Sequence, residues 1–385
     1  MQKVALFFVR LLVSLNQVSQ MRITNENHTT QLQTLRLCHG MPYSTQGVLL
    51  CIVQSEPPPQ ASTNSYGREA TEQGTPHMAT PTNLQYDRRY SLTIGDYSTG
   101  NGLLITSEDT DHPLQITFEV NKTSDTKHKA GNSTTIEIYN LTPVQAKLLE
   151  SQYISFEFRV GYNNEDGLSL IAQGNVTEAT TVKRGTDTIT QIKVGEGYVA
   201  LDHTRISQNL SPGQTVEDVI RVIVAAMPGI SRGPIVGTNL SSPIVHGWRL
   251  SGTAKEELDK ITKAYNLEYS ISNNTLIMTD LNQPTSKTVL NVPVISSETG
   301  MIDKPFRITE QIRLGKKDKR TRPGIQVKTL LNPAFTVSSV VKIESDDING
   351  YFRINSLRYN GEFRGQPWHS ELRCSEMTDA DITIT

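Results

Sequence analysis

The sequence predicts a mainly β protein with a smaller α/β part, in which two related β-barrel domains are separated by an α/β domain. Two regions, about 90–197 and 324–374, alternate apolar with polar residues, as antiparallel strands with one buried face do. Helical periodicity dominates the region between them. The two β regions also resemble each other weakly, which indicates an internal duplication.

The first β region contains six expected strands followed by clear turns. The strands are expected at 90–96, 114–120, 133–141, 153–162, 168–185 and 187–197. One of them ends at Asn140-Leu141-Thr142-Pro143, where Thr142 is the expected N-cap of a short helix and Pro143 its first residue.

The α/β region begins near Ser211 and contains two amphipathic helices. The apolar face of the first consists of Val216, Val219, Ile220, Ile223 and Val224, and that of the second of Leu258, Ile261 and Tyr265. The acids Glu256, Glu257 and Asp259 lie in the first turns of the second helix, which Ser251 or Thr253 opens, and there they favour the positive end of the helix dipole. Two short strands joined at Ser272-Asn273-Asn274 follow, and the Gly- and Pro-rich residues 229–250 are expected to form a surface loop.

The second β region repeats the first in outline. Strands are expected at 324–333, 338–345, 350–361 and 367–374. Residues 136–143 match 325–333, 153–162 match 339–345, and Gly174–Gly185 has the same spacing as Gly350–Gly361. The sequence therefore predicts two versions of one barrel, with the α/β domain inserted between them.

These patterns define four segments in the chain of 385 residues. Residues 1–77 are expected to be a non-native or disordered leader, because they lack periodicity, include a Pro-rich tract and precede a possible native start at Met78. Arg10 interrupts the apolar run after Lys3, so a secretory signal is the less favoured interpretation. The first barrel is expected at 78–203, the α/β domain at 204–290 and the second barrel at 291–385.

Composition argues against several functional classes. Lys plus Arg is 37 and Asp plus Glu is 39, spread along the chain, so the footprint of a nucleic-acid-binding protein is absent. Cys38, Cys51 and Cys374 form neither a disulfide framework nor a CxxC spacing, so we expect no metal site and no cofactor. The basic run at 316–322 has no interleaved aromatic residue and is interpreted as a solvated loop.

Few residues suggest catalysis. His203 and Asp202 are adjacent and could be imagined with Ser207 or Ser211, but no GxSxG elbow presents a nucleophile. His246 and Trp248 could line a pocket, although packing is the simpler interpretation. We therefore expect no catalytic residues, no cofactor-binding residues, no metal ligands and no enzymatic activity.

The order of the segments resembles the baseplate central hub proteins of tailed bacteriophages over about residues 90–375. The family's opening strands correspond to "ITFEVNKTSD" and "NSTTIEIYNLTP", and its helix with hairpin to "SGTAKEELDKITKAYNLEYSISNNTLIM". "ISSETGMIDKP" resembles the linker into the second barrel, "GIQVKTLLNPAFTVSSVVKIES" a strand pair, and "INGYFRINSLRYNGEFRGQPWHSELRC" the closing hairpin. The sequence departs from the family at Met301 and Asp303, where relatives often have Leu and Gly, and at Ser338, where a turn glycine is common.

The resemblance implies a structural virion protein with tube-type barrels. It implies a homotrimeric baseplate hub that joins the tail tube or distal tail protein to the central spike, contacts wedge proteins, and lets genome DNA pass through its lumen. The expected location is the tail baseplate of the virion, and the host cytoplasm during assembly. The alternative is a secreted carbohydrate-binding or adhesive β-protein, which would draw on the leader and on the sequons at Asn121, Asn132, Asn140, Asn175, Asn239 and Asn273.

Overall fold

The computed structural model describes residues 87–96, 100–108, 110–124, 132–150, 153–163, 167–286, 288–289, 292–313, 319–377 and 383–384. The chain divides into two units, residues 1–76 and 77–385, and every described residue belongs to the second. The leader predicted at 1–77 lies outside the described residues.

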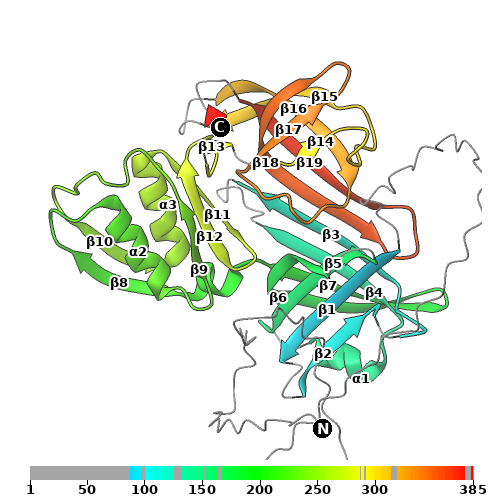
Figure 1. The fold of residues 1–385 in the computed structure, drawn as a ribbon. Helices are drawn as coiled ribbons and strands as arrows, with labels where there is room; N and C mark the ends of the chain where they lie inside the picture. Colours follow the sequence, from blue (N-terminus) through cyan, green and yellow to red (C-terminus); the bar gives the residue numbers. More distant parts are fainter. Residues whose placement is uncertain are drawn as a thin grey trace, which may run out of the picture. The chain divides into compact units, whose positions relative to one another are not determined.

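One large sheet dominates the described part of the chain (Figure 1). Its thirteen described strands are β1 (Arg88–Asp96), β2 (Asn101–Thr106), β3 (Ile116–Thr123), β4 (Ser133–Tyr139), β5 (Ser155–Tyr162), β6 (Ser169–Arg184), β7 (Asp187–Gly195), β14 (Val294–Ile295), β15 (Phe306–Arg313), β16 (Lys319–Leu330), β17 (Val340–Glu344), β18 (Asn349–Glu362) and β19 (Trp368–Glu376). Most were predicted from their alternating pattern, whereas β2, β14 and β15 were not.

The strand order of the sheet is β15-β16-β19-β18-β3-β4-β7-β6-β5-β1-β2, with β17 beside β18 and β14 beside β17. Neighbours along this path are antiparallel, and β14 is parallel to β17. No pairing among the described strands closes the sheet, so the prediction of two closed barrels is not confirmed. Instead, Ser356–Glu362 of β18 pair with Thr117–Thr123 of β3 and join the two β regions. We call this pairing the seam.

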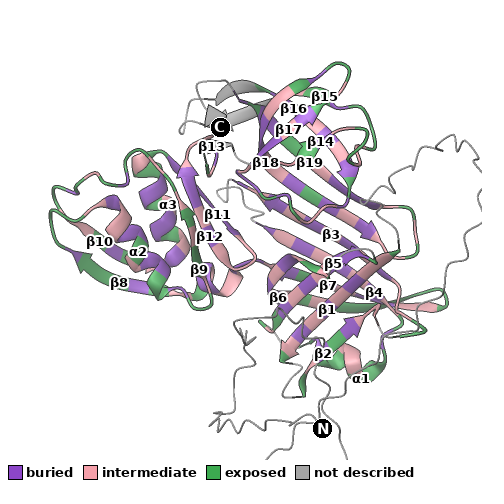
Figure 2. Ribbon diagram, in the orientation of Figure 1, coloured by how far each residue is buried: buried purple, intermediate pink, exposed green. Residues whose placement is uncertain are grey.

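Alternation along the strands places one face of the sheet in a common apolar core that includes residues of both β regions (Figure 2). Phe118 of β3 belongs to this core, with its ring centroid 4.9 Å from that of Phe158 and 5.2 Å from that of Trp368. A Cβ atom on Gly361, across the seam, would overlap the Phe118 ring. Glycine at this position therefore lets the two halves approach closely.

The α/β region has a core of its own. Its elements are a short π-helix (Val199–His203), β8 (Arg205–Leu210), α2 (Val216–Ala226), β9 (Ser231–Ile235), β10 (Trp248–Thr253), α3 (Ala254–Tyr265), β11 (Leu267–Ser272) and β12 (Thr275–Asp280). β8 pairs with β10, and β12 lies between β11 and β9. The predicted apolar face of α2 is buried, as are Leu258 and Ile261 of α3.

The prediction that residues 229–250 form only a surface loop is wrong. This segment contains β9 and the start of β10, and β9 pairs in parallel with β12. Gly233 and Pro234 conceal the strand in the sequence. An edge strand tolerates a proline, because one side of its backbone needs no ladder partner.

Local signals set the helix ends as expected. Thr142 caps α1 (Pro143–Leu148) in a capping box with Gln145, and Thr253 rather than Ser251 caps α3. Asn273 and Asn274 both have positive φ, 50° and 55°, as the turn of a two-residue hairpin requires.

Two further short strands, β13 (Thr288–Val289) and β20 (Thr383–Ile384), pair in parallel. Within the described residues, helices long and apolar enough to cross a membrane are lacking.

Candidate functional site

The β11–β12 hairpin reaches the seam and contacts both halves of the large sheet through buried and half-buried polar side chains. We call this set of residues the polar junction: Lys122, Asn132, Glu196, Glu268, Ser270, Ser272, Asn273 and Arg353. They come from three separate parts of the sequence, namely the first β region, the hairpin and the second β region.

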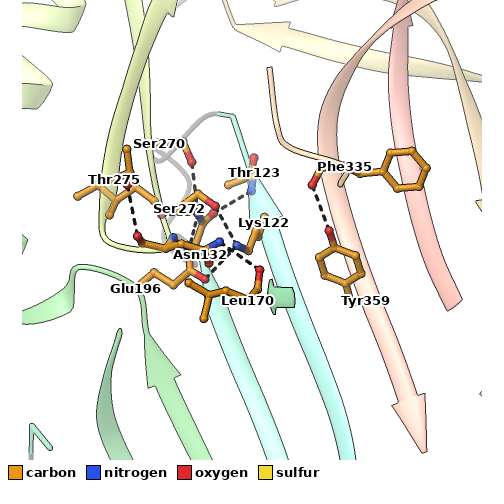
Figure 3. Close-up of polar contacts among 12 residues, drawn as sticks. Lys122, Thr123, Asn132, Leu170, Glu196, Ser270, Ser272, Thr275, Phe335 and Tyr359 are labelled. Carbon is orange, nitrogen blue, oxygen red and sulfur yellow. Dashed lines mark hydrogen bonds and ion pairs between the residues drawn. The ribbon is translucent and has the colours of Figure 1, made fainter. Parts of the chain in front are cut away.

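Lys122, near the end of β3, forms the first half of the junction (Figure 3). Its Nζ donates to Ser272 Oγ and to Asn273 Oδ1, both at 2.8 Å, and lies 3.4 Å from Glu196 Oε1. The side chains of Lys122 and Glu196 are 4% and 0% exposed, so this is a fully desolvated ion pair.

Asn132 and Glu196 bind the same part of the hairpin, its tip at Ile271 and Asn273. Asn132 Nδ2 donates to the backbone carbonyl of Ile271 at 2.5 Å and to Glu196 Oε2 at 3.2 Å. Its Oδ1 accepts from the backbone N–H of Thr123 at 2.8 Å. Glu196 Oε2 also accepts from the backbone N–H of Asn273 at 3.3 Å, whereas Oε1 receives no hydrogen bond. The hairpin tip is therefore held by backbone and side-chain groups together.

Arg353 of β18 forms the second half. Its guanidinium pairs with the Glu268 carboxylate on β11, and the two side chains are 1% and 4% exposed. Nη2 also donates to Ser338 Oγ at 2.9 Å, and Nη1 donates to Asn355 Oδ1 at 2.6 Å. Nε donates to the backbone carbonyl of Gln283, after β12, at 2.9 Å. The donors of this arginine thus bind the hairpin, the segment after it and β18 together.

Burial controls the protonation of the Lys122 pair. It lowers the pKa of Lys122 and raises the pKa of Glu196, and each charge opposes the shift of the other. Each group thus needs its partner to stay ionised. Removing one partner would leave the other desolvated and uncompensated.

The contacts of the polar junction fix the positions of the elements that carry them. Buried polar contacts are directional, and their geometry is satisfied in one relative position of the packed elements. Glu268 is shared between Arg353 and Thr279, whose Oγ1 lies 3.4 Å from Glu268 Oε1. The junction therefore holds the hairpin against both sides of the seam in one orientation.

Comparison with known proteins assigns the family. The family model for baseplate hub gp41 matches residues 99–374, which is most of the chain and includes every residue of the polar junction. The chain belongs to the baseplate hub gp41 family. No curated protein matches the sequence.

Two solved structures with a TM-score of 0.50 support the fold of this baseplate hub protein, and a third is reported beside them. A tail protein from Neisseria meningitidis MC58 superimposes with a TM-score of 0.50 at 13% identity, covering 77% of this chain and 98% of that one. A chain of the Francisella PdpA-VgrG complex, half-lidded, gives 0.50 at 9% identity, covering 78% and 60%. The 43 kDa tail protein of prophage MuSo2 from Shewanella oneidensis gives 0.49 at 10%, covering 77% and 100%.

The departure of the hub sequence at Ser338 has a structural reason. Ser338 has φ 65°, in the left-handed region that favours glycine. Its side chain is buried, and its hydroxyl accepts from Arg353. Serine therefore accepts backbone strain at this turn but adds a bond to the polar junction.

The residues considered for catalysis do not come together in the hub. Asp202 Oδ1 lies 3.7 Å from Lys255 Nζ, and the ring of His203 packs on Tyr153 with centroids 5.0 Å apart. Ser207 lies exposed on β8, and Ser211 follows that strand. His246 is exposed, and the Trp248 ring centroid lies 6.3 Å from that of Tyr265.

Sequence reasoning missed the polar junction. Lys122 continues the phase of Ile116, Phe118 and Val120, all on the buried face of β3. A charged residue in the apolar phase of a strand requires a buried partner, and this was the available signal. The partner itself was not predictable, because Glu196 and Ser272 are distant in sequence.

Proposed function

We propose that this protein is the homotrimeric central hub of a tail baseplate, where it joins the tail tube to the central spike and lets DNA pass during ejection. The observation that carries the proposal is the repeated strand order. β15-β16-β19-β18 and β3-β4-β7-β6 are the same four-strand arrangement, side by side in one sheet. Three copies would present six such units, which matches a six-fold tube on one side and a three-fold spike on the other.

The domain organisation proposed for the hub has three parts after the leader. Residues 78–203 and 291–385 form two related tube-type barrel domains, and 204–290 form the α/β domain. The separate core of the α/β region supports this division. The seam and the shared core of the two β regions support a rigid pair of barrel domains. Such rigidity is expected of a ring that holds the tail tube on one side and the spike on the other.

The proposed partners are a second and third copy, the tail tube or distal tail protein, the spike and the wedge proteins. The similarity to a chain of a PdpA-VgrG complex supports a position beside a spike. The hub works in the virion baseplate, assembles in the host cytoplasm and has no enzymatic activity of its own.

Deleting the gene from the parent phage tests this function against the adhesive alternative. Without a hub the tail has no initiation site, so lysates should contain heads without tails, and a plasmid copy should restore tails. Intact tails that only fail to adsorb would contradict the proposal and favour the adhesive protein.

A further inference from the structure

The outer halves of β6 and β18 are built alike, although they belong to different β regions. Each strand has a register shift, between Val176 and Glu178 in β6 and between Ile354 and Ser356 in β18. Just before the shift, each exchanges two backbone hydrogen bonds with an incoming segment. In β6 these join Val176 to Tyr153 and Ile154, both at 2.9 Å.

The corresponding bonds of β18 are nearly identical. Ser338 N–H donates to the Ile354 carbonyl at 2.8 Å, and Ile354 N–H donates to the Ser339 carbonyl at 2.9 Å. Tyr153 and Ser338, the first residues of the two incoming segments, have φ 64° and 65°. Val176 is therefore the counterpart of Ile354, and Glu178–Arg184 of Ser356–Glu362. The sequence comparison that matches Gly174 with Gly350 aligns these two strands two residues out of register. In the structure, Gly174 lies two residues before Val176, whereas Gly350 lies four residues before Ile354.

One difference separates these outer halves. Ser356–Gly361 pair with β19 on one side, and Ser356–Glu362 pair with β3 on the other. Glu178–Arg184 pair with β7, and on the other side no described strand is bonded to them. This edge is exposed and rich in β-branched residues, including Thr180, Thr181 and Val182, the last of which is 41% exposed. Such an edge is a template for another strand.

The counterpart of β3 is β15, at the far end of the sheet. Register partners can be followed from strand to strand across each four-strand arrangement. Across β6, β7, β4 and β3 they are Val176, Val194, Thr134 and Val120. Across β18, β19, β16 and β15 they are Ile354, Cys374, Ile325 and Arg307. Arg307 of β15 therefore occupies the place of Val120 of β3. Like the outer half of β6, β15 has one described ladder partner, in its case β16.

We propose that the outer half of β6 in one copy of this chain pairs antiparallel with β15 of a second copy, reproducing the seam between molecules. Transferring the register of the seam places Val182 opposite Phe306 and Thr180 opposite Ile308. Phe306 is 55% exposed, so the transferred register brings two exposed apolar side chains face to face. Cross-strand aromatic and β-branched pairs stabilise sheets, and burial of Phe306 adds to this.

The contact is heterologous, since two different edges meet. Heterologous contacts propagate from copy to copy and end in a ring where the rotation closes. The inference rests on the proposed hub and names the surface through which three copies would close. Along such a ring, in-chain and between-chain seams alternate.

Paired cysteines test the contact in purified tails. The chain would carry Val182→Cys with Phe306→Cys, and Cys38→Ser and Cys51→Ser to leave only the buried Cys374. Opposed cysteines in antiparallel strands lie within disulfide range, so most of the chain should shift to covalent species up to a trimer on oxidation. Each single variant should stay monomeric on the gel. So should the control pair Val182→Cys with Val245→Cys, since Val245 is 71% exposed but lies on the α/β region.

The outcomes distinguish this contact from the hub function. Tails that contain the chain at the normal level but yield only monomer would overturn the contact and leave the hub intact. A covalent dimer from the single Val182→Cys variant would also overturn it, because that requires a symmetric interface. If the wild-type chain is absent from purified tails, the hub function fails. The contact is then tested by oxidising the concentrated full-length cysteine variants and running the same gel.

Discussion

Two buried cations hold the β11–β12 hairpin against the seam, and they do so differently. Arg353 donates to five separate groups, including the Glu268 carboxylate and, at 3.5 Å, Ser124 Oγ. Lys122 is a point charge that binds Ser272, Asn273 and Glu196, and it leaves Glu196 Oε1 without a hydrogen bond. A planar guanidinium satisfies several acceptors from one position, which an ammonium group cannot do. The second β region therefore supplies the more completely satisfied attachment.

Removing the guanidinium should give the largest effect. Arg353→Met takes away the cation that compensates the buried Glu268 carboxylate, and we expect the free energy of unfolding to fall by about 3–5 kcal/mol. Urea denaturation of the full chain measures this loss. The control is Arg358→Met on the same strand, where a half-exposed pair with Glu119 at 2.6 Å should contribute about 0–1 kcal/mol. Equal losses for the two variants would refute the importance of the junction.

Removing the ammonium should cost less. In Lys122→Met, Glu196 can take up a proton, because burial already raises its pKa, so we expect a loss near the lower end, about 3 kcal/mol. The double variant Lys122→Met with Glu196→Gln should recover part of it, because neither of these two positions then carries a buried charge. Additive losses in this double-mutant cycle would show that the two side chains do not interact.

Protonation of Glu196 gives the Lys122→Met variant a pH dependence. A carboxyl group whose pKa is raised in the folded state contributes stability below its unfolded pKa and loses it as pH rises through the folded value. The variant should therefore be less destabilised at acidic pH than at alkaline pH, relative to the wild type. Denaturation at both ends of the range in which the wild type stays folded measures this difference. A pH-independent loss would contradict the assignment.

The smallest expected effect concerns α3, which packs beside β11 without entering the junction. Thr253 accepts from the Glu256 N–H at 3.2 Å, and Thr253→Ala should lower the free energy of unfolding by about 1 kcal/mol. Thr253→Ser keeps the hydroxyl and should retain most of that stability. A loss as large as that of Arg353→Met would mean that the helix, and not the junction, controls the position of the hairpin.

The sequence predicted elements that have a local cause. Alternation located most strands, helical spacing located α2 and α3, and Thr142 and Pro143 marked the start of α1. The sequence did not predict β15, because its alternation is limited to Phe306 and Ile308 and no clear turn residues marked the ends of the strand. Nor did it predict the seam or the pairing of Arg353 with Glu268, since these depend on segments far apart in the chain.

We propose that three copies of this chain form the hub on the tail axis. Reconstruction of the intact baseplate by cryo-electron microscopy gives their number and position. We expect three copies encircling the axis between tube and spike, with six four-strand units facing the tube. Six copies of the chain, or copies at the periphery of the baseplate, would contradict it.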